Sequence, residues 1–146
     1  MTKTRIPLII VCALTVLTVI FIFSRSIPDK VESYRESSLI VALFELVFGE
    51  GNVNGRLVRK LAHFTEFAVL GAELSVLLWV IRKKSLQAYL NIIFAAATVA
   101  LCDETIQIFS GRGPQVQDVW IDIFGAVVGI ALLLGIRAMA FAIKEN

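Results

Sequence analysis

The 146-residue chain has few charged residues, three prolines, two cysteines and one histidine. Charged residues make up 18% of it, against about 25% in an average soluble domain, and apolar residues 58%, against about 45–50%. The apolar residues lie in long blocks, and the first, 6–23, contains no charge. Blocks of this length can cross the hydrocarbon core of a bilayer. The composition therefore excludes a nucleic-acid-binding domain, a disordered tail, a secreted miniprotein and an ordinary cytosolic enzyme, and it indicates an integral membrane protein.

The chain is also poor in the side chains that disulfides and many metal centres require. Cys12 and Cys102 both fall inside apolar runs, so we expect two small buried apolar side chains and no disulfide. His63 is the single histidine, which excludes a multi-histidine metal centre. The net charge of +2 is too balanced to indicate a polyanionic partner, and we expect no binding of nucleic acid.

Four apolar runs predict an all-α integral membrane protein with four transmembrane helices in one bundle, forming a single domain over residues 1–146. The predicted spans cover 6–23, 61–81, 86–109 and 116–136. A long outer loop, 24–60, joins the first two, because Pro28-Asp29 breaks the first helix. The segment Ser37–Phe48 is apolar but too short to cross the membrane, so we expect a short interfacial or re-entrant helix there.

The basic residues predict the orientation of the spans. Three of them are packed into the short connection at 82–84, and others flank the two termini. The loop 24–60 also carries basic residues, but it spreads them over a long stretch that contains several acidic ones. The positive-inside rule therefore predicts that both termini lie in the cytoplasm.

Ionisable side chains of the last three spans gather at the outer end of the predicted bundle. The second span begins there, the third ends there and the fourth begins there. The residues are Lys60, His63 and Glu66 on the second span, Asp103, Glu104 and Gln107 on the third, Arg112 after it, and Asp118 and Asp122 on the fourth. We expect these groups to face one another, because polar groups inside a bundle can satisfy each other and lipid cannot satisfy them.

Helical periodicity narrows the directions of these side chains. The second span presents one polar arc of about 140°, which contains Lys60, His63, Glu66 and Glu73. On the fourth span, Asp118 and Asp122 share a stripe with two glycines. The spacing Gly125-x-x-x-Gly129 predicts a close approach to a neighbouring helix.

Carboxyl groups outnumber basic groups at this end of the bundle. Carboxylates close together in a poor dielectric cannot all stay ionised, so some should be protonated or hold a cation. No cofactor is evident beyond such a divalent cation, and with one histidine an oxygen-rich, magnesium-type site is expected. The candidate metal ligands are Glu66, Asp103 and Glu104. The alternative is a salt-bridge network with a purely structural role.

Three motifs of the chain resemble those of the VanZ-like family of bacterial membrane proteins, over residues 56–130. The first, RKLAHFTEF at 59–67, opens the second span. The second is DETIQ at 103–107, followed by GRG at 111–113, and the third is DVWIDIFG at 118–125. Asp122 departs from the family's pattern D-x-x-x-N-x-x-G, in which an asparagine is expected at this position.

The resemblance implies a four-helix domain in the bacterial plasma membrane that contributes to resistance against teicoplanin, a lipid-tailed glycopeptide that acts on cell-wall precursors outside the membrane. The expected partner is a membrane lipid or a lipid-linked cell-wall precursor in the cell envelope, bound or modified at an outward-facing polar site. Lys60, His63 and Arg112 would hold an anionic head group, and Gln107 would orient it. Glu66, Asp103 and Glu104 would provide a general base or a cation site. The expected ligand-binding set is Lys60, His63, Glu66, Asp103, Glu104, Gln107, Arg112 and Asp118.

Two alternatives stay open. An intramembrane lipid-phosphate hydrolase would use a bound divalent metal to activate water, with His63, Glu66, Asp103 and Glu104 as candidate catalytic residues. A small proton-coupled transporter would use Glu66 or Glu73 as the proton carrier. The sequence leaves open whether the protein is an enzyme, and it indicates no oligomeric state.

Overall fold

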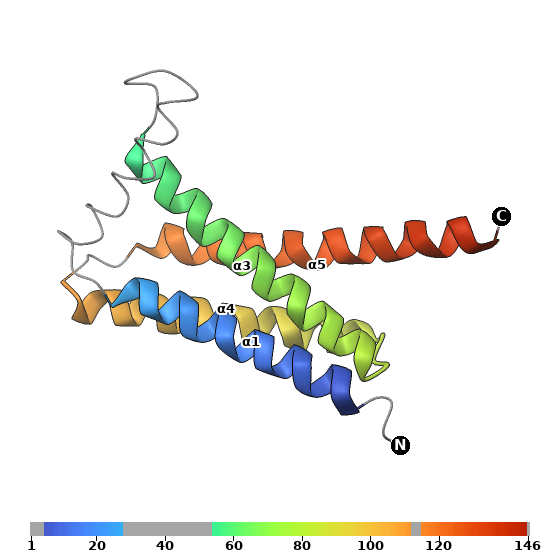
Figure 1. Cartoon of the computed structure of the whole chain (residues 1–146). Helices are drawn as coiled ribbons and strands as arrows, with labels where there is room; N and C mark the ends of the chain where they lie inside the picture. The colour runs from blue at the N-terminus through green and yellow to red at the C-terminus, as the bar shows by residue number, and fades with distance from the viewer. Residues whose placement is uncertain (1–4, 28–53, 112–114, 146) are drawn as a thin grey trace, which may run out of the picture.

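A computed structural model describes residues 5–27, 54–111 and 115–145 of the chain. Within these residues the chain forms four helices and no strand: α1 (Arg5–Ser26), α3 (Gly55–Val80), α4 (Leu86–Phe109) and α5 (Val116–Glu145) (Figure 1). Each helix is long and apolar enough to cross a membrane. The prediction of an all-α membrane protein with four spans in one bundle is therefore confirmed. The short helix expected at Ser37–Phe48 lies outside the described residues.

Three of the helices extend beyond the apolar runs that predicted them, because hydropathy marks only the lipid-crossing part of a helix. The side chain of Asn54 accepts a hydrogen bond from the backbone N–H of Arg56 at 3.0 Å and caps α3, which begins at Gly55, six residues before its apolar run. Ser85 caps α4 in the same way, accepting from the N–H of Ala88 at 3.2 Å. The fourth span is predicted to end at Ile136, but α5 continues to Glu145.

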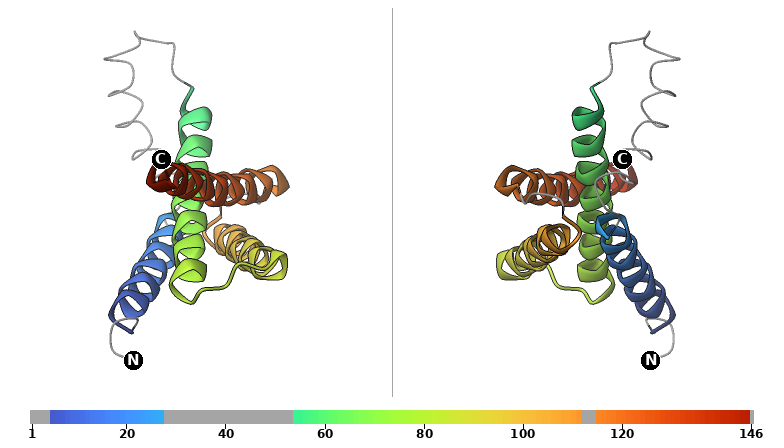
Figure 2. Two further views of the ribbon diagram at one scale, coloured as in Figure 1. Left: turned by 90° about the vertical axis from the view of Figure 1, so that its right-hand side faces the viewer. Right: turned by 90° about the vertical axis from the view of Figure 1, so that its left-hand side faces the viewer.

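Helix α3 packs most extensively against α5 and also contacts α1 and α4. Helix α4 likewise contacts the other three helices, whereas α1 and α5 do not contact each other in the described part of the chain (Figure 2). Helices α1 and α4 run in one direction, and α3 and α5 run in the other. The beginning of α1, the α3–α4 connection and the end of α5 therefore lie toward one end of the bundle, and the beginnings of α3 and α5 lie toward the opposite end.

Helices α3 and α5 cross at glycines that allow their backbones to meet. A Cβ added to Gly125 would fall on the backbone carbonyl of Phe64, and one added to Gly129 would fall on that of Ala68. Gly71 on α3 meets the backbone of α5 in the same way. The close approach predicted from Gly125-x-x-x-Gly129 is confirmed, and its partner is α3.

A small apolar core lies one helical turn below the polar end of the bundle. Its buried members are Ile22, Phe67, Leu70, Ala96, Ala100 and Ala126. Ile22, Phe67 and Ala126 each lie four residues from a polar side chain of the site described below, so they form its floor. Cys12 and Cys102 are free but exposed on the outside of the bundle, so the expectation that they are buried was wrong.

Candidate functional site: a polar cluster at one end of the bundle

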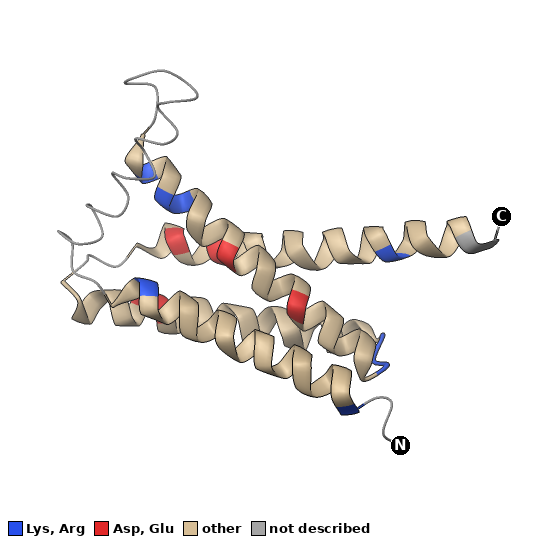
Figure 3. Cartoon of the chain, in the orientation of Figure 1, with Lys and Arg blue, Asp and Glu red and all other residues tan. Residues whose placement is uncertain are grey.

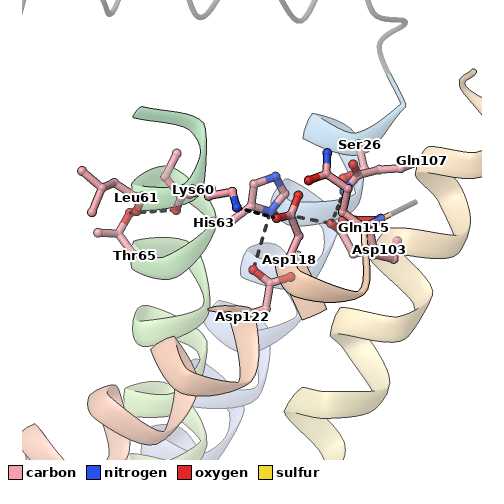
Figure 4. Close-up of polar contacts among 12 residues, drawn as sticks. Ser26, Lys60, Leu61, His63, Thr65, Asp103, Gln107, Gln115, Asp118 and Asp122 are labelled. Atoms are coloured by element: carbon pink, nitrogen blue, oxygen red, sulfur yellow. Dashed lines mark hydrogen bonds and ion pairs between the residues drawn. The ribbon is translucent and has the colours of Figure 1, made fainter. Parts of the chain in front are cut away.

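Helices α1 and α4 end where α3 and α5 begin, and polar side chains of all four helices meet there (Figure 4). We call this group the polar cluster; its members are Ser26, Lys60, His63, Asp103, Glu104, Gln107, Asp118 and Asp122. Most of them are buried. Lys and Arg residues at the start of α3 and at the end of α1 lie around these acidic groups (Figure 3).

Asp103 is the most deeply buried member, with 0% exposure. Its Oδ1 accepts a hydrogen bond from Ser26 Oγ at 2.5 Å, and its Oδ2 accepts one from Gln107 Nε2 at 2.9 Å. The first bond connects α1 to α4, and the second comes from the next turn of α4 itself. Both oxygens of this carboxylate are therefore held in fixed positions from two sides.

His63 lies between two buried carboxylates. Its Nδ1 is 3.8 Å from Asp103 Oδ2 and 3.8 Å from Asp122 Oδ1. Both distances exceed the 2.7–3.2 Å or so of an N–H···O hydrogen bond. The side chains nevertheless point toward one another in Figure 4. The three residues come from three helices, and one ligand atom of each lies within 4.8 Å of those of the other two.

The rim of the polar cluster is more open than its floor. Lys60 Nζ lies 3.7 Å from Asp118 Oδ1, and their side chains are 33% and 17% exposed. The Oε2 atom of Glu104 accepts a hydrogen bond from the backbone N–H of Gln115 at 3.4 Å. The charged groups of α3 and α5 at the rim are thus partly exposed.

The polar arc predicted on α3 is divided between two neighbouring faces. Lys60 and His63 turn toward α4 and α5, but Glu66 and Glu73 turn toward α1. Glu73 accepts a hydrogen bond from Thr18 of α1 at 2.9 Å. Glu66 lines a groove of about 390 Å³ between α1 and α3, together with Leu14, Leu17, Thr18, Phe21, Thr65 and Val69.

The polar cluster contains six of the eight residues expected to bind a ligand, and Glu66 lies beside it in the groove between α1 and α3. Glu66 lies within electrostatic range of Asp103 and of Arg25. The remaining expected residue, Arg112, lies outside the described residues.

Two residues of the polar cluster, Ser26 and Asp122, are not among the site residues predicted from the sequence. Ser26 was assigned to the loop, because the apolar run ends at Phe23. Its spacing of i, i+4, i+8 with Thr18 and Ile22 is the signal that could have placed it on the inner face of α1. Asp122 is predicted to lie at the polar end of the bundle but is not in the expected ligand-binding set, because it departs from the family's pattern. Its position one turn after Asp118 already put it on the stripe that faces α3.

The group that could hold a metal also differs from the expected one. The expected ligands were Glu66, Asp103 and Glu104. Among the described residues, the group with metal-ligand spacing consists of His63, Asp103 and Asp122, so only Asp103 is common to both. A ligand set with one imidazole nitrogen and two carboxylates suits zinc, manganese or iron better than magnesium, which prefers a site made of oxygen ligands only.

Comparison with known families gives one match that covers most of the chain. The profile of the VanZ/LLP1 family matches residues 8–138, from α1 to the last turns of α5. This range includes the residues of all four helices that form the polar cluster. Comparison with curated proteins and with solved structures gave no match.

Proposed function

The chain belongs to the VanZ/LLP1 family, and from this premise we propose that its polar cluster binds the anionic head group of a membrane lipid or a lipid-linked cell-wall precursor. Binding at this site lowers the sensitivity of the cell to teicoplanin. The observation that carries the proposal is a buried polar site with a partly exposed rim at one end of a membrane bundle, beside a mainly apolar groove.

The head group of such a lipid corresponds to the polar cluster, and its acyl chain corresponds to the groove between α1 and α3. Lys60 at the rim supplies a cation for a phosphate or carboxylate, and Arg25 and Arg59 are half-buried at the same end. The groove between α1 and α3 is lined mainly by apolar side chains, with Glu66 among them. Its volume of about 390 Å³ falls in the range of about 300–1,000 Å³ that is typical of small-molecule sites. An acyl chain of the lipid would occupy it.

The proposed orientation puts both termini in the cytoplasm of the bacterial plasma membrane. The three basic residues at 82–84 support it, because short cytoplasmic connections are rich in Lys and Arg. The polar cluster then faces the outside of the cell. A lipid-tailed glycopeptide meets its target on that side.

Resistance in a sensitive Gram-positive host tests the proposal. We expect the wild-type chain to raise the minimal inhibitory concentration of teicoplanin several-fold and that of vancomycin little. His63→Ala and Glu104→Gln should abolish the rise, because the first removes an imidazole and the second a carboxylate from the site that positions the head group. Membrane levels of each variant are compared by immunoblot.

Asn91→Ala is the matched control, since Asn91 is an exposed polar residue of α4 at the opposite end of the bundle. It should retain the full rise. If both cluster variants protect the cells as well as the wild type at equal membrane levels, the assignment of the site fails. If well-expressed wild type gives no rise, resistance is not the role of this chain.

A lipid-phosphate hydrolase is the second candidate. The position of His63 between Asp103 and Asp122 favours it, because a metal held there could activate water. Release of inorganic phosphate from a lipid phosphate by the purified protein, lost in Glu104→Gln, would favour turnover over binding alone.

A further inference from the structure

We propose that His63, Asp103 and Asp122 form a binding site for one divalent transition-metal ion, Zn²⁺ or Mn²⁺, which joins α3, α4 and α5. The inference goes beyond the proposed lipid binding, because the side chains of the protein would hold the ion without any lipid present. It is carried by the spacing of the three ligand atoms, by an unsatisfied buried carboxylate oxygen and by the charge of the site.

The spacing of the ligand atoms is close to that of a metal site. His63 Nδ1 is 3.8 Å from one carboxylate oxygen of each aspartate. Zinc binds imidazole nitrogen and carboxylate oxygen at about 2.0–2.2 Å, so two ligands in tetrahedral geometry lie about 3.4 Å apart. The two His63 distances exceed this value by about 0.4 Å, and all three ligand atoms lie within 4.8 Å of one another. A small movement of His63 and Asp122 toward Asp103 would bring the three atoms onto one ion.

Asp122 provides the second, independent observation. Its side chain is 1% exposed, and within the described residues its Oδ1 accepts no hydrogen bond. A buried carboxylate oxygen without a partner is costly. This oxygen points toward His63 in Figure 4, into the space that the ion would fill. A metal ion supplies the partner that the oxygen lacks.

The charge of the site also favours a cation. Asp103 and Asp122 are both buried, and Lys60 is paired with Asp118 at 3.7 Å. A single proton on His63 would balance only one of the two carboxylates. A divalent ion balances both and binds neutral imidazole at the same time.

The surroundings of Asp103 resemble the outer shell of a metal site. Ser26 and Gln107 donate hydrogen bonds to its two oxygens and fix the direction of the carboxylate. A carboxylate oxygen has two lone pairs, so Asp103 Oδ2 can accept the hydrogen bond from Gln107 and bind the ion at the same time. Outer-shell partners of this kind typically contribute about 10–100-fold to metal affinity. Three protein ligands leave a coordination position toward the open rim.

Metal binding is measured on the full chain, purified in detergent through an affinity tag without histidine, stripped with EDTA and desalted. Isothermal titration and elemental analysis after dialysis against Zn²⁺ or Mn²⁺ should give one ion per chain, with much weaker binding of Mg²⁺. The variants Asp122→Asn and His63→Gln should bind no ion. Gln107→Leu should weaken binding about 10–100-fold.

Glu73→Gln is the matched control, because it removes another intramembrane carboxylate that faces α1 instead of the site. It should bind one ion with unchanged affinity. Size exclusion verifies that each variant is folded. Zn²⁺ should also raise the melting temperature of the wild type and of Glu73→Gln but not that of Asp122→Asn.

The proposal is overturned if the wild type binds neither Zn²⁺ nor Mn²⁺ in these assays, or if folded Asp122→Asn binds as the wild type does. Equal loss in Glu73→Gln would also overturn it, because binding would then follow total charge. The metal-binding assays contain neither the lipid ligand nor the antibiotic, so a failure to bind metal can be distinguished from a failure of the resistance test. A chain that binds the ion and gives no resistance would refute only the proposed function.

Discussion

Asp103 illustrates how a carboxylate can be kept inside an apolar bundle. It is fully buried, and yet both of its oxygens accept hydrogen bonds, one of them from Ser26 on another helix at 2.5 Å. Removal of that donor would leave a buried, charged acceptor with one partner fewer. Such a loss costs about 1–3 kcal/mol, or more when the group is charged.

We therefore expect Ser26→Ala to destabilise the protein by about 1–3 kcal/mol, measured as a lower melting temperature in detergent. Ser24→Ala is the control. Its hydroxyl is exposed and donates to the carbonyl of Phe21 in its own helix at 2.7 Å. If the two variants melt at the same temperature, the bond between Ser26 and Asp103 does not contribute to stability.

At the scale of the helix, the crossing of α3 and α5 depends on the absence of side chains. Gly129 and Gly125 bring α5 onto the carbonyl groups of Ala68 and Phe64. Lipid provides no hydrophobic force to hold two helices together, so close van der Waals packing of this kind is the main attraction. The same crossing brings Asp122 opposite His63, and the geometry of the site therefore depends on it.

We expect Gly129→Ala to destabilise the protein by about 1–3 kcal/mol, because its methyl group would overlap a backbone atom that cannot rotate away. Gly135→Ala lies on the same helix, where an added Cβ meets nothing within 4 Å. This control should be neutral or up to about 1 kcal/mol more stable, since alanine favours the helix. Thermal unfolding followed by fluorescence-detected size exclusion separates the two outcomes, and equal melting temperatures would contradict the packing argument.

The sequence predicted the helices and the polar end well, but not the pairs of side chains that meet there. Apolar runs mark the spans, and alternating directions bring the end of α4 to the same level as the beginnings of α3 and α5. Periodicity restricts a side chain only to a broad arc. It could not reveal that Glu73 faces Thr18 of α1 while His63, on the same arc, faces Asp122 of α5. That division is decided by the packing of the helices.

At the scale of the whole molecule, charge differs between the two ends of the bundle. The α3–α4 connection at one end carries three successive basic residues, and the acidic side chains of the polar cluster lie at the other. The proposed orientation follows from this difference, because basic connections stay on the cytoplasmic side.

Labelling of introduced cysteines tests the orientation. The free residues Cys12 and Cys102 lie outside the polar cluster and are first replaced by serine. In intact cells, a membrane-impermeant maleimide should then label Gln117→Cys and leave Lys83→Cys unlabelled. Both should react after permeabilisation, which serves as the control. The reverse pattern in intact cells would place the polar cluster in the cytoplasm.

The order of the four helices along the chain has a consequence for how the protein is made. Helices α3 and α4, with His63 and Asp103, leave the ribosome before Asp118 and Asp122 of α5 do. Until then the polar cluster is incomplete on the side that α5 will cover. A nascent chain that stops before α5 would leave His63 and Asp103 without the side chains of α5 that cover them in the finished molecule, and lipid cannot satisfy such groups.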